Sequence, residues 1–206
     1  MTSIGRKEHG ERRAYWIETG HAVHLEGRLP VGQYTDRSTG CRNRHYLLEV
    51  LEPQIAVAQQ YGFPLSLALD EIAHFRQIRF TFGESAAEGI MSELADIISS
   101  TVRGTDLVVR YAEETFAVLF LHSTQFGASR ACDRMRMKIS HHTFHSVKSD
   151  LVVVVNFGIA EQSADFDPHG RTLLAAAEDA LRQAGAVGDY AIVRHADLQA
   201  VPEKAI

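Results

Sequence analysis

Two short apolar runs, separated by only four residues, constrain the fold of this 206-residue chain more than any other feature. The first run covers Leu107 to Tyr111, and the second covers Phe116 to Leu121. Each has the length and the β-branched and aromatic content of a strand. The intervening residues, Ala112 to Thr115, are enough for a tight turn and for little else. The sequence therefore predicts a β-hairpin near the middle of the chain.

Segments with a helical period and further apolar runs surround this hairpin. Helices are predicted at 47–62, 90–102, 124–141 and 173–184, and Pro53 should kink or break the first of them. Further strands are predicted at 65–69, 151–155 and 190–193. The run from Leu151 to Val155 is wholly apolar, so we expect a central strand buried on both faces. This order predicts one sheet with helices packed on it.

Composition restricts the classes of function and the compartment. The formal net charge is −5, so a broad basic face for nucleic acid is not expected. No apolar run approaches the length of a membrane span, and no membrane association is expected. Cys41 and Cys132 are far apart in the sequence, which favours two free thiols in a reducing cytoplasm. We expect an N-terminal arm at 1–35, one domain at 36–198 and a short tail at 199–206.

Several blocks of the chain resemble the GGDEF domains of diguanylate cyclases. The residues at the predicted turn, Tyr111-Ala-Glu-Glu-Thr-Phe116, are similar to the family signature Gly-Gly-(Asp/Glu)-Glu-Phe. Similar blocks lie in the family's order at 36–44, 67–76, 155–160 and 177–185. The resemblance implies an α+β fold, the nucleotidyl-cyclase palm, in which helices flank a mostly antiparallel central sheet.

The same resemblance implies that the chemistry of the family has been lost. GGDEF enzymes join two GTP molecules into cyclic di-GMP, with metal-binding carboxylates, turn glycines that approach the triphosphate and a lysine for phosphate. The departures are Ala112 and Glu113 for the glycines, Thr115 for an acid, Glu71 and Ala73 for two aspartates, Arg79-Phe80 for Asn-Asp, and Gly185 for the lysine. Glu114 retains a family acid, and Glu88 is a close replacement for another. We expect no catalytic residues, no metal site and no cofactor.

A second motif of the family is intact. Arg103 and Asp106 match the Arg-x-x-Asp motif at which GGDEF proteins bind their product, and Arg134 matches a further arginine of that site. An arginine fork can hold guanine O6 and N7 or a phosphate, and a carboxylate can accept from guanine N1 and N2. Arg130 lies one helical turn before Arg134 and is a plausible phosphate contact. The resemblance implies a receptor that binds cyclic di-GMP and signals through a partner protein.

Other interpretations of these residues remain open. Arg103 could complement the dipole at a helix C-terminus, Asp106 could cap the turn before the strand, and Arg130 and Arg134 could form a solvated face with Asp133. The protein would then be a ligand-independent adapter. A residual GTP-binding or cyclase domain is a third possibility. Homodimers, including dimers bridged by ligand, are compatible with each of these.

Overall fold

The computed structural model describes residues 33–147 and 151–199. The elements in chain order are β1 (Arg42–Asn43), α1 (Arg44–Tyr61), β2 (Leu65–Ile72), α2 (Phe75–Phe82), α3 (Glu84–Thr101), β3 (Leu107–Ala112), β4 (Thr115–Leu121), α4 (Gln125–Ser140), β5 (Val155–Glu161), α5 (Arg171–Val187), β6 (Ile192–Arg194) and α6 (His195–Gln199). The predicted arm up to residue 32, and the predicted tail beyond Gln199, lie outside the described residues. No helix in the described ranges is both long enough and apolar enough to cross a bilayer.

One six-stranded sheet organises the fold, in the order β1-β3-β4-β2-β5-β6. The central pairs β3–β4, β4–β2 and β2–β5 are antiparallel, whereas the two edge strands β1 and β6 pair in parallel. The predicted hairpin is the β3–β4 pair. The expectation of an α+β fold with a mostly antiparallel sheet is confirmed.

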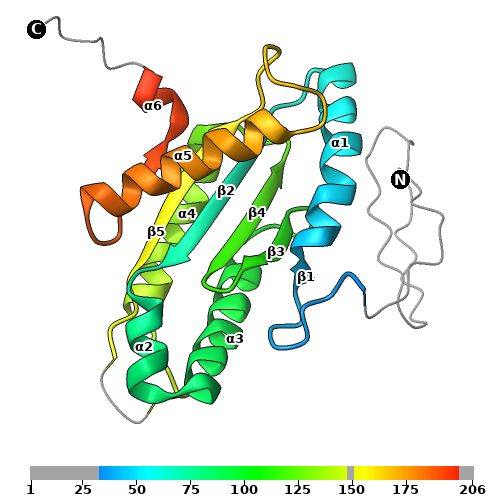
Figure 1. Ribbon diagram of the computed structural model, residues 1–206. Coiled ribbons are helices and arrows are strands. Elements are labelled where there is room, and N and C mark those ends of the chain that lie inside the picture. The colour runs from blue at the N-terminus through cyan, green and yellow to red at the C-terminus, as the bar shows by residue number, and fades with distance from the viewer. Residues whose placement is uncertain (1–32, 148–150, 200–206) are drawn as a thin grey trace, which may run out of the picture.

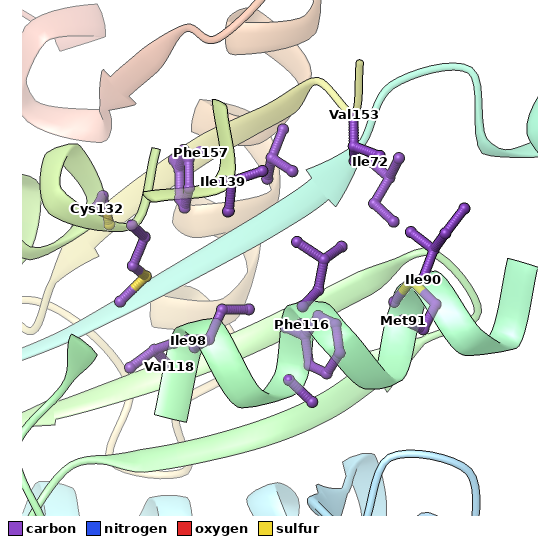
Figure 2. Packing of buried hydrophobic residues seen from close by; sticks show 14 of the residues in the cluster. Ile72, Ile90, Met91, Ile98, Phe116, Val118, Cys132, Ile139, Val153 and Phe157 are labelled. Atoms are coloured by element: carbon purple, nitrogen blue, oxygen red, sulfur yellow. The ribbon is translucent and has the colours of Figure 1, made fainter. Parts of the chain in front are cut away.

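Helices cover both faces of the sheet (Figure 1). Successive side chains of a strand point to opposite faces of the sheet, so alternate residues of β2 pack against the helices on different faces. Leu65, Leu67 and Leu69 pack in the core under α1 and α5. Ala68 and Ile72 pack in the core under α3 and α4. In Figure 2, side chains of α3 lie against Phe116 on the sheet.

Local signals mark the helix ends. The side chain of Asn43 accepts a hydrogen bond from the backbone of Tyr46 at the start of α1, which satisfies one of the unpaired N–H groups of the first turn. The same helix ends at Gly62, whose φ of 70° lies in the left-handed region that favours glycine. Thr124 caps α4 by accepting from the backbone of Gly127. These boundaries lie within three residues of those of the predicted helices.

The predicted central strand at 151–155 is wrong. Residues 151–154 form no strand, Val152 is 68% exposed, and β5 begins only at Val155 and continues to Glu161. The segment is apolar for another reason, because Val153 enters the core from a loop (Figure 2). The carbonyl oxygen of Val154 accepts a hydrogen bond from the backbone of Ala73 at 2.9 Å, which ties that loop to the end of β2.

Two smaller expectations need correction, and one helix was missed. The break at Pro53 is absent, since α1 runs through it without interruption; buried Leu51 and Ile55 hold the helix on the sheet on either side. The last strand begins at Ile192, because Tyr190 has a φ of 58° and is not extended. Helix α2 was not predicted at all, although Phe75 and Ile78 give it a short buried face.

Glu93 on α3 fastens the segment that follows α4. Its carboxylate accepts hydrogen bonds from Nε2 of His142 at 2.8 Å, from the backbone of His145 at 3.0 Å, and from the backbone and hydroxyl of Ser146 at 2.9 and 2.5 Å. Burial alone would raise the pKa of Glu93, but the bonds from Ser146 and His142 lower this pKa to about 2. The ionised carboxylate is therefore the form that stabilises the fold.

We expect Glu93→Gln to lower the free energy of unfolding at pH 7 by roughly 2 kcal/mol, because hydrogen bonds to a charged acceptor are lost. The folded pKa is depressed, so this stabilisation is present above the ordinary value of 4.5 and disappears as the pH falls toward about 2. Urea unfolding at several pH values measures the effect. Glu49→Gln on the exposed side of α1 is the control. Equal urea unfolding curves for wild type and Glu93→Gln at pH 7 would contradict the prediction.

Candidate functional site

A buried arginine, Arg110, holds the tip of the β3–β4 hairpin through hydrogen bonds to its backbone. Ala112 pairs with Thr115 after a register shift in β3, which leaves Glu113 and Glu114 at the turn. Arg110 is only 8% exposed, and its guanidinium donates to the carbonyl oxygens of Ala112, at 2.7 Å, and of Glu113. These bonds fix the backbone of the turn and direct its two acidic side chains outward.

An ion pair joins this turn to α2. Nη1 of Arg79 pairs with Oε1 of Glu113, and Nε of Arg79 lies 3.2 Å from Oε2 of Glu84. The same guanidinium lies 5.0 Å from the centre of the Phe75 ring. The hydrogen bond to Glu113 raises the pKa of Arg79 further above its ordinary value. Arg79 and Glu113, two positions at which the resemblance implies a departure from the family, are thus partners in space.

The remaining positions at which the resemblance implies a departure from the family lie around the same turn or on α5. Glu71 is exposed near the end of β2, and its pKa is raised by burial and by the nearby charge of Glu114. Thr115 is buried in β4, while Ala73 follows β2 in the loop to α2. Gly185 lies on the exposed side of α5. Within the described residues, no three His, Cys, Asp or Glu side chains converge to hold a metal ion.

Arg103 and Asp106 meet in the turn between α3 and β3. Oδ2 of Asp106 accepts a hydrogen bond from the backbone N–H of Arg103 at 2.9 Å, and the backbone N–H of Asp106 donates back to the Arg103 carbonyl oxygen at 3.0 Å. The side chain of Asp106 is 9% exposed, and burial raises its pKa although the Arg103 bond opposes the shift. The backbone N–H of Leu121 on β4 also approaches this carboxylate and opposes the shift, whereas Oδ1 itself is buried and makes no hydrogen bond of ordinary geometry in the described part of the chain.

The other two predicted arginines lie on α4, which packs beside α3 on the same face of the sheet. Arg130 and Arg134 are both exposed, and Nη1 of Arg134 donates to the carbonyl oxygen of Arg130 at 3.1 Å. The neighbouring Asp133 pairs with Arg136 at 2.7 Å and neutralises neither of them. Arg103 is exposed as well. The structure thus places three exposed arginines, which form no side-chain ion pair among the described residues, on one side of the sheet.

One buried acid was missed. Asp70 on β2 is 2% exposed, and its Oδ2 has no hydrogen-bond partner within the ranges that the structure describes. Burial raises the pKa of Asp70 well above its ordinary value. Burial also raises the pKa of the Cys132 thiol on α4, and the charge of Asp70 would add to that shift. The period of two along β2, which puts Asp70 on the same face as Ala68 and Ile72, is the signal that could have located it.

Comparison with known proteins identifies the fold and the family. The family model described as "Diguanylate cyclase, GGDEF domain" matches residues 33–190. The chain belongs to the GGDEF family. Response regulator PleD of Caulobacter vibrioides is 32% identical over 161 residues, which is 77% of this chain and 35% of PleD. The chain thus spans about a third of the length of that relative.

Solved GGDEF structures share this architecture. Diguanylate cyclase SiaD of Pseudomonas aeruginosa, solved with its activator SiaC, matches with a TM-score of 0.73 and 26% identity over 79% of this chain and 62% of SiaD. The GGDEF domain of DgcB from Caulobacter crescentus, solved with c-di-GMP, matches with a TM-score of 0.74 and 22% identity over 80% of this chain and 96% of that domain. The second likeness shows the fold alone. This chain is therefore a GGDEF domain related to diguanylate cyclases.

Proposed function

We propose that this GGDEF domain is a catalytically silent receptor for cyclic di-GMP. The ligand binds at Arg103 and Asp106, with Arg134 and Arg130 as further contacts. The observation that carries the proposal is the turn between α3 and β3. It places the exposed Arg103 side chain next to the Asp106 carboxylate, which hydrogen bonds within the turn hold in position. An arginine fork beside a carboxylate is the pair of groups that the edges of a guanine base can engage.

The chemistry of these groups matches a guanine nucleotide with phosphodiester links. The Arg103 fork can hold guanine O6 and N7, while Asp106 accepts from N1 and N2 of the same base. The two exposed arginines of α4 supply charge-assisted hydrogen bonds for phosphate oxygens. The two arginines of α4 favour an anionic ligand over a neutral or cationic one.

Loss of catalysis is supported by the chemistry around the hairpin. A triphosphate would have to approach Glu113 and Glu114 and displace the Arg79–Glu113 ion pair. The resemblance to the family implies that Ala112, Thr115, Ala73 and Gly185 also replace groups needed for substrate or metal. Each lost electrostatic contact costs about 3 kcal/mol, or roughly two decades of rate. Four such losses leave no useful turnover, even when they combine less than additively.

The output of the receptor is a changed contact with a signalling protein in the cytoplasm. SiaD, solved with its activator SiaC, shows that a related diguanylate cyclase is bound by a protein partner. Dimers of this chain, including dimers bridged by cyclic di-GMP, fit the same proposal. No resident cofactor and no nucleic acid take part.

Two measurements on the purified protein test the proposal. In titration calorimetry, we expect cyclic di-GMP to bind in the micromolar range or tighter, whereas GTP with magnesium gives no saturable heat. In a parallel incubation with GTP and magnesium, chromatography should detect no cyclic di-GMP. Turnover that disappears in Glu114→Ala would instead establish a residual cyclase. Absence of heat with cyclic di-GMP would refute the receptor.

A ligand-independent adapter is the second candidate. The observation that favours it is the hydrogen bond from the Arg103 backbone to Asp106, because this bond already gives the carboxylate a structural role. The adapter predicts that partner capture is unchanged by cyclic di-GMP and by Arg103→Ala. The receptor predicts that the ligand changes partner capture in wild type and has no effect in Arg103→Ala.

A further inference from the structure

One side of α1, away from the core, carries an open hollow of about 620 Å³. Leu48 is 41% exposed there, and Pro53 and Ala56 continue its apolar floor toward the end of the helix. The described residues that line the hollow all belong to α1: His45, Leu48, Glu49, Glu52, Pro53 and Ala56. We call these six residues the α1 groove.

The polar groups of the α1 groove restrict what can occupy it. Its two carboxylates already have partners, since Glu49 lies 3.9 Å from Nε2 of His45 and Glu52 lies 2.9 Å from Nδ1 of His169. Charge therefore does not select the occupant. Pro53 has no N–H, so the carbonyl oxygen of Glu49 lacks the donor that an α-helix would otherwise supply. The groove suits an apolar side chain that also carries a hydrogen-bond donor.

The described structure begins at one end of this groove. Nδ2 of Asn43 donates a hydrogen bond to the carbonyl oxygen of Gln33 at 2.9 Å, and the backbone N–H of Asn43 donates to the carbonyl oxygen of Tyr34 at 3.0 Å. The ring of Tyr34 stacks on His45, with the ring centres 5.0 Å apart. These contacts hold Gln33 beside α1, so the chain before it starts from the edge of the groove.

We propose that the segment Ala14-Tyr15-Trp16-Ile17 of the same chain docks in the α1 groove. Tyr15 and Trp16 are the only Tyr and Trp among residues 1–32, which contain no Phe. Each combines a large apolar ring with a hydrogen-bond donor. Packing of these rings on Leu48 removes apolar surface from water, and the indole N–H of Trp16 can supply the donor that the Glu49 carbonyl oxygen lacks.

The length of the connecting chain fits this contact. Residues 18–32 join the segment to Gln33 and number 15. The groove rises by about 17 Å along α1 from His45 to Ala56. A 15-residue chain without regular structure has a root-mean-square end-to-end distance of roughly 20 Å. Docking within one chain is most favourable when these two lengths match, because the effective concentration is then in the millimolar range.

The contact goes beyond the proposed function. Helix α1 packs on one face of the sheet, whereas α3 and α4, which flank or carry the predicted ligand residues, pack on the other. The docked segment would give this domain an occupied α1 surface whether or not a nucleotide is bound.

Fluorescence of the full chain tests the proposal, because Trp16 is its only tryptophan. We expect emission at shorter wavelength and weaker acrylamide quenching than in the protein unfolded by urea. Leu48→Glu and Ala56→Glu each place a charge in the groove and should raise the acrylamide quenching constant about twofold or more. Val187→Glu, at an exposed apolar residue of α5, is the matched control and should leave quenching unchanged. Dilution should not change the emission, since the contact lies within one chain.

Three results would overturn the proposal. A Trp16 that is as accessible in the folded protein as in urea would mean that the segment does not dock. Wild-type quenching in both groove variants would mean that Trp16 packs elsewhere. Emission that moves to longer wavelength on dilution would mean that a second copy provides the contact. The substituted side chains are all exposed, and unchanged far-UV circular dichroism verifies the fold. These readouts use no nucleotide, so their failure is distinct from failure of the cyclic di-GMP proposal.

Discussion

Replacing Arg103 by alanine should remove saturable binding of cyclic di-GMP. The side chain is exposed and makes no ion pair within the described residues, so its loss leaves the fold unchanged. A bidentate arginine–guanine pair contributes about 1–3 kcal/mol, and the loss of its charge near phosphate adds to that. We therefore expect the Kd to rise by roughly a hundredfold or more. Titration calorimetry of wild type and Arg103→Ala under the same salt conditions measures the change.

Arg136→Ala is the matched control for this experiment. Arg136 lies on α4, as Arg130 and Arg134 do, but its guanidinium pairs with Asp133 at 2.7 Å. It is not one of the predicted ligand contacts. Its removal changes the net charge of the protein by the same amount as Arg103→Ala. Equal losses of affinity in the two variants would mean that general charge, and not the Arg-x-x-Asp turn, attracts the nucleotide.

Replacing Asp70 by asparagine should stabilise the protein, and the gain should increase with pH. Burial raises the pKa of Asp70 well above its ordinary value of 3.8, so the folded state retains a proton that the unfolded chain releases. Between these two pKa values, wild type loses about 1.4 kcal/mol of stability for each unit of rising pH from this one group. Asparagine keeps the shape of the side chain and cannot ionise, so this component of the pH dependence disappears.

Urea unfolding from pH 4 to pH 8 measures this effect as the difference between variant and wild type. Asp165→Asn, at an exposed aspartate in the loop after β5, controls for the change in net charge. A difference between Asp70→Asn and wild type that stays constant over this range would show that Asp70 is ionised in the fold. The buried carboxyl would then have a stabilising partner, against what the structure shows.

Periodicity predicted the elements whose side chains alternate between core and solvent. The hairpin and the four long helices were expected from the sequence because their apolar residues repeat at the spacing of a strand or a helix. The segment 151–154 misled this approach, because its valines are apolar without being in the sheet. Helix α2 was not predicted, because its two buried residues, Phe75 and Ile78, are too few to show a helical period in the sequence.

The candidate site was predictable as a set of residues and not as a set of contacts. The spacing of Arg103 and Asp106 before the turn at 112–115 was visible in the chain, and so was each residue of that turn. The Arg79–Glu113 ion pair was not, because it joins two elements that are distant in sequence. Similarly, the cap that Asp106 provides to Arg103 was one of several open interpretations, and only the geometry of the turn identifies it.

The position of the bound ligand tests the central claim most directly. A crystal of the protein grown with cyclic di-GMP should show a guanine against Arg103 and Asp106, with phosphate oxygens toward Arg134 and Arg130 and the Arg79–Glu113 pair intact. Density for the nucleotide at the β3–β4 turn, with that ion pair broken and the Arg103 turn empty, would contradict the account.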